Sequence, residues 1–276
     1  MNSSKQKVYI HLESDQLGDC IAWLPYIDIA REKYNWDVYT NFHYYYLFND
    51  VYPSVKFEVP VNFDKKFIID VVDREKPLQW SAAHILGIDY IEQRPRFNTS
   101  KLKKTEGKTI TFSEYGSNFC KSWNNPIGWF KVIQHVRNLG YDYIAVSKEP
   151  TILSDVVDCT GLDLIDVCTL IYNSSMYVGV SSGLAWLAWC LGVPVVMVSG
   201  HTKRYFEFNS NIVRLGPSDD SICFGCYNDN NLEIKWEDVW CPHYKGTVRQ
   251  HECTYSISHT DVINAINYVL KNRLKI

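Results

Sequence analysis

The stretch from residue 178 to residue 200, VGVSSGLAWLAWCLGVPVVMVSG, limits the possible folds of this chain more than any other segment. It predicts a buried strand, a tight Ser-Ser-Gly turn, an apolar helix, a Gly-Val-Pro break and a second buried strand. That order places Ser181, Ser182 and Gly183 at a helix N-terminus, where free N–H groups and the helix dipole favour phosphate. The turn lacks the GxGxxG and GxxxxGK(S/T) patterns, which argues against an ordinary dinucleotide or P-loop site. A plain α/β crossover with a small-residue turn is the alternative.

The composition indicates a folded globular protein. Of the 276 residues 46% are hydrophobic, which argues against a disordered chain. The formal net charge of −3 excludes a globally basic one. The first residues, MNSSKQKVYIHLE, lack the apolar region of a signal peptide, and no apolar run is long enough to span a membrane. We therefore expect a cytoplasmic protein, in the host cytoplasm if a phage encodes it. In that reducing compartment the nine cysteines are expected to be thiols or metal ligands.

Strand and helix patterns alternate in two series, which predicts two doubly wound α/β lobes facing each other across a cleft. The N-terminal lobe is expected over residues 1–107 and the C-terminal lobe over 108–259. The final helix, within 260–276, is left free to pack back on the first lobe. An irregular segment, 223–253, interrupts the second series. The predicted strands cover 7–12, 37–40, 66–71, 108–113 and 143–146, and the predicted helices cover 20–34, 80–86, 128–139, 164–173 and 261–272.

The tripeptide Leu17-Gly18-Asp19 follows the first predicted strand and opens the first predicted helix. Helix N–H groups stabilise a carboxylate at such a position. The simple interpretation is a helix cap. The functional interpretation makes Asp19 a general base that accepts the proton of an attacking hydroxyl.

Lys121 lies in the loop KSWNNP, between a predicted strand and a helix whose first turn holds Trp129. A lysine in such a loop can neutralise a diphosphate as a compact point charge. The alternative is a solvated surface lysine. The tryptophan and asparagines that follow Lys121 argue against a fully exposed side chain.

Four cysteines in the irregular segment have the spacing of a metal site: Cys223, Cys226, Cys241 and Cys253. A CxxC pair spans one edge of a tetrahedron, and two further thiolates complete a four-sulfur site. Such a set suits iron or zinc and leaves no open coordination position, which predicts a structural role. The alternative is a reduced cluster of thiols without a metal.

Four blocks of this sequence together resemble the heptosyltransferase superfamily of GT-B glycosyltransferases, most of all the bacterial autotransporter heptosyltransferases. The blocks are LGDCIAWLP, KSWNNPIGWFKVI, the 178–200 stretch, and the segment from CFGCYND to WCPHYKGTVRQHECT. The resemblance implies a GT-B fold, α/β with two facing Rossmann-like lobes and a Cys-rich metal finger at 223–253. It also implies that Asp19 is the base, that Lys121 holds the donor phosphates, and that Ser181, Ser182 and Gly183 bind the diphosphate. In that family the four cysteines bind iron, which favours iron over zinc.

The resemblance implies an inverting glycosyltransferase that moves a heptose or another sugar from a nucleotide-diphosphate donor to a hydroxyl. The turn and Lys121 would meet the leaving-group charge, so no catalytic divalent cation is expected. The family's usual acceptors are a protein or a glycolipid. Proteins of the family carry an extra N-terminal domain, whereas this sequence begins directly at the first predicted strand. The nucleobase, the sugar and the oligomeric state are left open.

Two alternatives to this function stay open at the level of the sequence. One is a phage-type glycosyltransferase acting on a hydroxymethylated base in DNA, with a basic run as the candidate acceptor or nucleic-acid contact. The other is a non-catalytic protein that binds a nucleotide sugar, which the presence of both Asp19 and Lys121 disfavours. The alternative interpretation of this basic run is a solvated linker. Its basic residues are Arg94, Arg96, Lys101, Lys103, Lys104 and Lys108.

Overall fold

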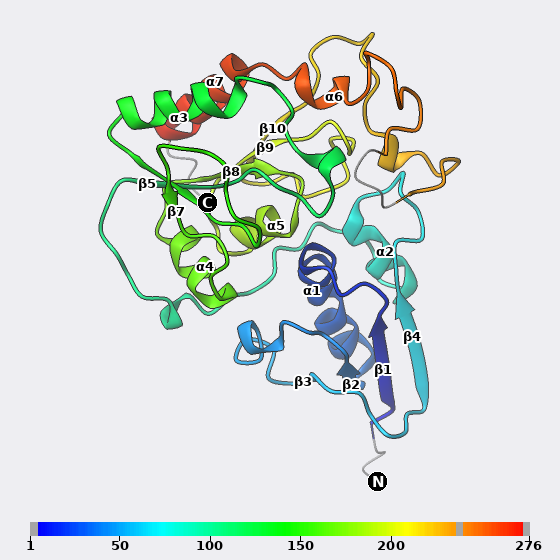
Figure 1. Cartoon of the computed structure of the whole chain (residues 1–276). Coiled ribbons are helices and arrows are strands. Elements are labelled where there is room, and N and C mark those ends of the chain that lie inside the picture. The colour runs from blue at the N-terminus through cyan, green and yellow to red at the C-terminus, as the bar shows by residue number, and fades with distance from the viewer. Residues whose placement is uncertain (1–4, 236–239, 273–276) are drawn as a thin grey trace. The chain divides into compact units, whose positions relative to one another are not determined.

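The computed structural model describes residues 5–235 and 240–272. It divides into two compact units, Met1–Lys101 and Leu102–Ile276. Each unit holds one parallel β-sheet with its helices, as the blue-to-cyan and green-to-red parts of Figure 1 show. The division falls inside the basic run 94–108, six residues before the boundary expected from the sequence.

The first unit is built on a four-stranded parallel sheet in the order β3-β2-β1-β4. Helix α1 connects β1 to β2, and α1 and α2 pack against each other and against the strands. Residues 20–27 of α1 are fully buried, Pro25 included, so this helix is a core element and not an amphipathic surface helix. The elements are β1 (Lys7–Leu12), α1 (Leu17–Tyr34), β2 (Asp37–Thr40), the 3-10 helix η1 (Tyr45–Leu47), β3 (Val55–Lys56), β4 (Lys65–Ile69), α2 (Leu78–Ile85) and η2 (Thr99–Lys101).

The second unit is built on a six-stranded parallel sheet in the order β10-β9-β8-β5-β6-β7. Helices α3 and α7 cover one face of this sheet and α4 and α5 the other (Figure 1). The elements are β5 (Thr109–Ser113), η3 (Phe119–Lys121), α3 (Gly128–Asn138), β6 (Asp142–Ala145), β7 (Val157–Asp158), α4 (Leu164–Tyr172), β8 (Tyr177–Val180), α5 (Gly183–Cys190), β9 (Val195–Val198), β10 (Ile212–Leu215), η4 (Cys226–Asn228), α6 (Glu252–Tyr255) and α7 (His259–Asn272).

The core of the second unit explains why its central elements are nearly all apolar. Every residue of β8 and β9 is buried, as expected for central strands of a parallel sheet covered on both faces. Helix α3 instead has a buried stripe at helical spacing, which packs on β5 and β6. The stripe consists of Trp129, Val132, Ile133 and Val136.

The C-terminal helix α7 belongs to the second unit. Val262, Ile266 and Val269 join the same core as α3, and α7 contacts α3, β9 and β10. The described residues of this helix therefore pack within the unit that precedes it, which corrects the expectation that it could return to the first lobe. Its last four residues, 273–276, lie outside the described residues.

The fold is mixed α/β with two parallel sheets, as the sequence predicted. Among the described residues no helix has both the length and the apolar character needed to cross a lipid bilayer.

Candidate functional site

Asp19 lies in the first turn of α1, not at its cap. The N-cap position is Gln16, which makes no side-chain capping hydrogen bond, so the helix begins three residues earlier than predicted. The Ser14 hydroxyl donates to Asp19 Oδ2 at 2.6 Å. Asp19 is half-buried at the carboxyl end of β1, and the helix dipole favours a carboxylate there.

Lys121 ends the short helix η3 that follows β5 in the second unit. Its Nζ donates to Ser117 Oγ at 3.1 Å. The stem of the side chain packs closely on Gly116, where an added Cβ would lie 3.0 Å from Lys121 Cβ. The absence of a side chain at residue 116 thus lets the lysine stem lie against the loop backbone.

The residues after Lys121 fasten its loop to the segment that follows Cys253. Trp123 Nε1 donates to the carbonyl of Ile257 at 3.0 Å, and Asn124 Nδ2 donates to Thr254 Oγ1 at 3.1 Å. Asn125 Nδ2 donates to the carbonyls of Tyr255 and Ile257 at 3.1 and 3.2 Å. The tryptophan and asparagines of the KSWNN motif therefore hold the lysine loop in place, a role that sequence reasoning did not identify.

The Ser-Ser-Gly turn connects β8 to α5 as predicted. Ser182 is the N-cap residue, with extended backbone angles, and Gly183 is the first helical residue. The first helical bonds are donated by the N–H groups of Ala185 and Trp186, both to the carbonyl of Ser182. The N–H groups of Gly183 and Leu184 therefore have no acceptor within the helix, as at any helix start, and are donors for an anion.

The two serines of this turn differ in their surroundings. Ser181 is nearly buried, and its hydroxyl donates to the carboxylate of Glu207. Ser182 and Gly183 are half-buried. The Ser181 hydroxyl proton is therefore committed to a protein acceptor. The role of the three residues in binding the diphosphate stays a prediction.

The basic run 94–108 is engaged largely within its own units. In the first unit, Arg96 pairs with Asp28 at 2.6 Å, and Lys101 donates to the Leu47 carbonyl and pairs with Asp50. In the second unit, Lys104 Nζ lies 4.0 Å from the centroid of the Tyr172 ring. The two ion pairs neutralise part of the charge that the DNA alternative required. Arg94, Lys103 and Lys108 are exposed.

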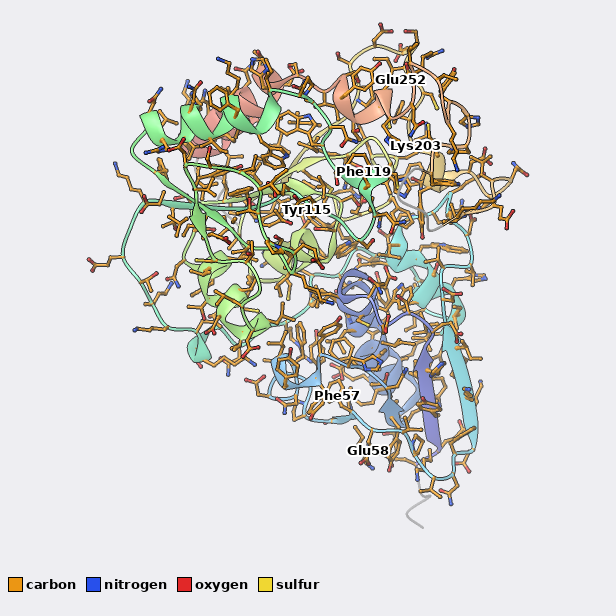
Figure 2. All side chains as sticks on the ribbon, viewed as in Figure 1. Phe57, Glu58, Tyr115, Phe119, Lys203 and Glu252 are labelled. Carbon is orange, nitrogen blue, oxygen red and sulfur yellow. The ribbon has the colours of Figure 1, made fainter. Side chains whose placement is uncertain are left out.

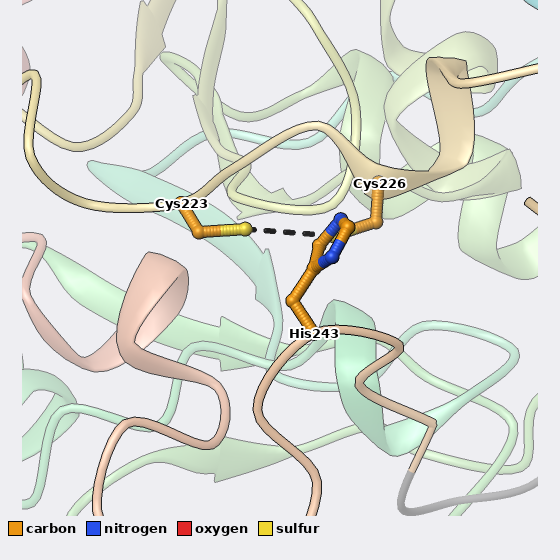
Figure 3. A group of neighbouring side chains, drawn as sticks. All are labelled: Cys223, Cys226 and His243. Carbon is orange, nitrogen blue, oxygen red and sulfur yellow. Dashed lines mark hydrogen bonds between the residues drawn. The ribbon is translucent and has the colours of Figure 1, made fainter.

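The predicted metal finger contains a compact cluster of ligand atoms. Cys223, Cys226 and His243 bring their ligand atoms within 4.8 Å of one another, and the two sulfurs are 4.0 Å apart (Figure 3). Cys223 and Cys226 were predicted as ligands, whereas His243 was not. Its only signal in the sequence is its place two residues after Cys241. Residues 236–239 of the finger lie outside the described residues.

Cys241 and Cys253 do not belong to this closest group, but they lie near it. Burial, together with the nearby Cys241 and Cys223, raises the pKa of the Cys253 thiol to about 12. Burial likewise raises the pKa of Cys226, with further contributions from Cys223, Cys253 and Cys241. The four predicted cysteines are thus mutual neighbours, although the structure does not draw them into one four-sulfur set. Two cysteines with one histidine or with two more thiols are both ligand sets that suit iron or zinc.

Three contacts fix the finger: two from the neighbouring loops, by Phe119 and Lys203, and one within the finger itself, by Glu252, all labelled in Figure 2. Phe119, before Lys121, packs its ring 5.7 Å from that of His251. Lys203, after β9, places Nζ 3.9 Å from the centroid of the Phe224 ring. Glu252 in α6 accepts the backbone N–H of Cys223 at 3.3 Å. The loops after β5 and β9 are therefore both held by the cysteine segment.

Gly200 and Gly225 show how tightly the finger is joined to the sheet. The N–H of Gly225 donates to the carbonyl of Gly200 at 2.7 Å. A Cβ on Gly200 would lie 2.4 Å from the carbonyl oxygen of Cys253, a distance that the backbone cannot relieve without moving. Gly225 has φ of 75°, in the region that favours glycine. Gly200 thus excludes a side chain because of packing, and Gly225 disfavours one because of its backbone conformation.

His201, in the loop after β9, gives the second unit a built-in sensitivity to acid. It is only 5% exposed, and burial, together with the nearby Lys121 and His251, lowers its pKa to about 3. An unfolded histidine has a pKa of about 6.5, so between pH 6.5 and 3 the unfolded chain binds a proton that the folded chain does not. Below pH 6.5 stability should fall by up to about 1.4 kcal/mol per pH unit from this residue alone.

Replacing His201 with glutamine should therefore flatten the loss of thermal stability between pH 7 and pH 5. Unfolding temperatures measured by circular dichroism across that range test this. The variant His43→Gln, at an exposed position, is the matched control for replacing a histidine with glutamine. Parallel curves for His201→Gln and the wild type would contradict the assignment.

Comparison with known proteins gives the family. No family model matches the sequence. The autotransporter heptosyltransferase Aah of Escherichia coli is 30% identical, over 96% of this chain and 75% of that protein. The chain belongs to the autotransporter heptosyltransferases. The crystal structure of the dodecameric iron-containing heptosyltransferase TibC in complex with ADP-D-beta-D-heptose matches with a TM-score of 0.91 and 26% identity, covering 99% of this chain and 78% of that one.

Membership of the autotransporter heptosyltransferases confirms the resemblance drawn from the four sequence blocks. It also confirms the GT-B fold class and makes the chain an enzyme, a glycosyltransferase. The family includes a protein named as inactive, the autotransporter heptosyltransferase BimC of Burkholderia thailandensis, which is 24% identical over 95% of this chain and 68% of that protein. The fold alone therefore does not guarantee turnover, and the roles of individual residues need their own argument.

Proposed function

We propose that this glycosyltransferase transfers a heptose from ADP-heptose to a hydroxyl group of a protein acceptor, with inversion at the anomeric carbon. Support for the donor comes from TibC, whose structure contains ADP-D-beta-D-heptose. Support for a protein acceptor comes from the names of the relatives, which are autotransporter heptosyltransferases. The observation that carries the proposal is the Ser-Ser-Gly turn at the start of α5, in a chain that matches TibC over almost its whole length.

The donor diphosphate is assigned to the second unit. The N–H groups of Gly183 and Leu184 supply fixed donors, with Ser182 beside them at the helix start, and Lys121 supplies a cation. Negative charge grows on the diphosphate as the bond to the sugar breaks. Preorganised donors meet that charge without the cost of reorienting water. This arrangement needs no divalent cation for the departure of the nucleotide.

The proton acceptor is assigned to the first unit, at Asp19. The acceptor hydroxyl attacks the anomeric carbon, the bond from that carbon to the diphosphate oxygen breaks, and the hydroxyl proton passes to the Asp19 carboxylate. Ser14 orients the carboxylate by donating to Oδ2 at 2.6 Å.

The metal is assigned a structural part in this proposal. Cys223, Cys226, Cys241 and Cys253 would hold one iron ion, the metal named for TibC. The donor set fits such an ion because soft thiolates suit iron, and His243 lies close enough to compete for one position. When bound, the ion would cross-link the irregular segment that supports the loops after β5 and β9.

The donor assignment predicts a specific gain in stability. ADP-heptose at a hundred times its Kd should stabilise the protein by about 2.7 kcal/mol in a thermal-shift experiment, and UDP-glucose at the same concentration should do little. Lys121→Ala should lose most of that gain, because it removes the cation assigned to the diphosphate. Lys148→Ala, at an exposed position of the same unit, should keep it. Equal shifts for the two variants would refute the role of Lys121.

Transfer itself is measured with radiolabelled ADP-heptose and three acceptors: an autotransporter passenger domain, a lipid extract and duplex DNA. We expect label in the passenger domain. Label in the lipid extract or in the DNA alone would overturn the protein acceptor and leave the donor assignment standing.

A further inference from the structure

A buried carboxylate lies beneath the donor turn and joins the ends of three neighbouring strands. Glu207 is 2% exposed. Its Oε1 accepts hydrogen bonds from the hydroxyls of Ser181 and of Thr202, the latter at 2.7 Å. Its Oε2 accepts from Nη1 of Arg214, whose side chain is 8% exposed. The carboxylate is therefore bonded on both oxygens and closed off from water.

Each partner of Glu207 comes from a different element. Ser181 directly follows β8, Thr202 lies in the loop after β9, and Arg214 is part of β10. These strands are adjacent and parallel in the order β10-β9-β8, so β8 and β9 end at the same edge of the sheet, where ligands bind in open α/β folds. Thr202 is fixed in turn by Ser199, whose hydroxyl lies 2.7 Å from its own. One carboxylate thus sets the spacing of all three segments at that edge.

We propose that Glu207 is a positioning residue of the donor site, which holds the Ser181 turn so that the N–H groups of Gly183 and Leu184 stay aimed at the diphosphate. This inference rests on the proposed function. Glu207 reaches the donor only through Ser181, because its own oxygens are occupied by Ser181, Thr202 and Arg214.

The chemistry of the network favours a positioning role over a purely stabilising one. Burying an ion pair costs much of its Coulomb energy in lost hydration, and apolar residues of similar volume often stabilise a protein equally well. The carboxylate instead fixes the orientation of its partners, because it accepts hydrogen bonds from two hydroxyls and a guanidinium in one geometry. Fixed geometry is what a donor turn needs, because small displacements of groups around a reacting centre reduce the rate steeply.

Glu207→Gln is the variant that tests the proposal. The amide oxygen can still accept from one hydroxyl, but the anion that fixes Arg214 is lost. We expect the affinity for ADP, measured by isothermal titration calorimetry, to fall roughly tenfold or more. Thr202→Val should give a smaller loss in the same direction, because Thr202 is joined to the turn through Glu207. The effect of Glu207→Gln should fall on the KM for the donor and on kcat, with the KM for the acceptor unchanged.

Asp28→Asn is the matched control for loss of a buried ion pair. Asp28 is 8% exposed and pairs with Arg31 at 2.7 Å and Arg96 at 2.6 Å, all within the first unit. This variant should lose thermal stability, as Glu207→Gln does, but keep the ADP affinity of the wild type. A merely structural role for Glu207 predicts the same affinity in both variants and would overturn the proposal.

Two further outcomes separate this inference from the proposed function. Binding of the wild type to ADP, UDP, GDP and CDP is measured first, and the ratio of wild-type to variant affinity is then taken for whichever nucleotide binds best. Preference for a nucleotide other than ADP counts against the proposed donor, yet a tenfold ratio still supports Glu207. If Glu207→Gln does not fold, the test passes to Thr202→Val, and an unchanged affinity there overturns the proposal. A wild type that binds none of the four overturns both.

Discussion

Asp19→Asn is expected to reduce sugar transfer by about 100- to 10,000-fold while ADP-heptose still binds with nearly unchanged affinity. The substitution keeps the shape of the side chain and its acceptor oxygen for Ser14, whose hydroxyl lies 2.6 Å from Oδ2. It removes only the ability to take up a proton at physiological pH. The loss should therefore appear in kcat, since an interaction made only in the transition state does not alter ground-state binding. Steady-state transfer and calorimetric binding with the same preparation measure the two quantities.

Asp15→Asn is the control, four residues before Asp19 and just before the start of α1. Asp15 is exposed, and its Oδ1 accepts a hydrogen bond from the side chain of Gln16. It carries the same charge into the same region, so any general electrostatic effect on the donor should appear in both variants. A nearly normal kcat in Asp19→Asn would move the base to another residue. A loss of equal size in Asp15→Asn would mean that local charge, not proton transfer, is responsible.

The sequence predicts the strands and helices of the central core well, because their signal is local. β1 and β2 have the predicted bounds, and the strand–turn–helix order around Ser181 is confirmed. β3, β7 and β10 were not predicted. β3 and β7 are two residues long, and every residue of β10 is half-buried, so none of them carries the continuous apolar run that marks a central strand. These strands depend on pairing with adjacent strands of the sheet, which the local sequence does not show.

The residues of the candidate site also fall into those that the sequence predicts and those that it does not. The Ser-Ser-Gly turn and the CxxC pair could be recognised because each is a short motif with its own chemistry. Glu207 could not, because its partner Ser181 lies 26 residues away and a lone glutamate in a sequence reads as a surface residue. His243 was missed for a related reason. An exposed histidine carries no signal by itself, and only the folded loop brings it to Cys223 and Cys226.

Cys226→Ser is expected to remove the metal and to loosen the donor side of the second unit. Apart from η4 and α6, the described part of the segment from Cys223 to Cys253 has no regular secondary structure. In the proposed metal site, metal–ligand bonds would therefore supply much of the order of this segment, because metal binding in such segments is coupled to folding. Elemental analysis of anaerobically purified protein should fall from about one iron per chain to nearly none. ADP affinity should fall as well, since Asn124 and Asn125 hold the lysine loop to residues 254–257.

Two more variants decide the ligand set. If the four thiols hold the ion, Cys253→Ser should lose the metal as Cys226→Ser does, whereas the exposed His243→Ala should keep it. The opposite pattern, with the metal lost in His243→Ala and kept in Cys253→Ser, would replace the four-sulfur set by one built on Cys223, Cys226 and His243, the residues that the structure brings closest together. Cys168→Ser is the control, because this buried thiol lies in α4 as a small core residue and its loss should leave the metal content unchanged. Wild-type protein that is fully folded without any metal would refute the structural role itself.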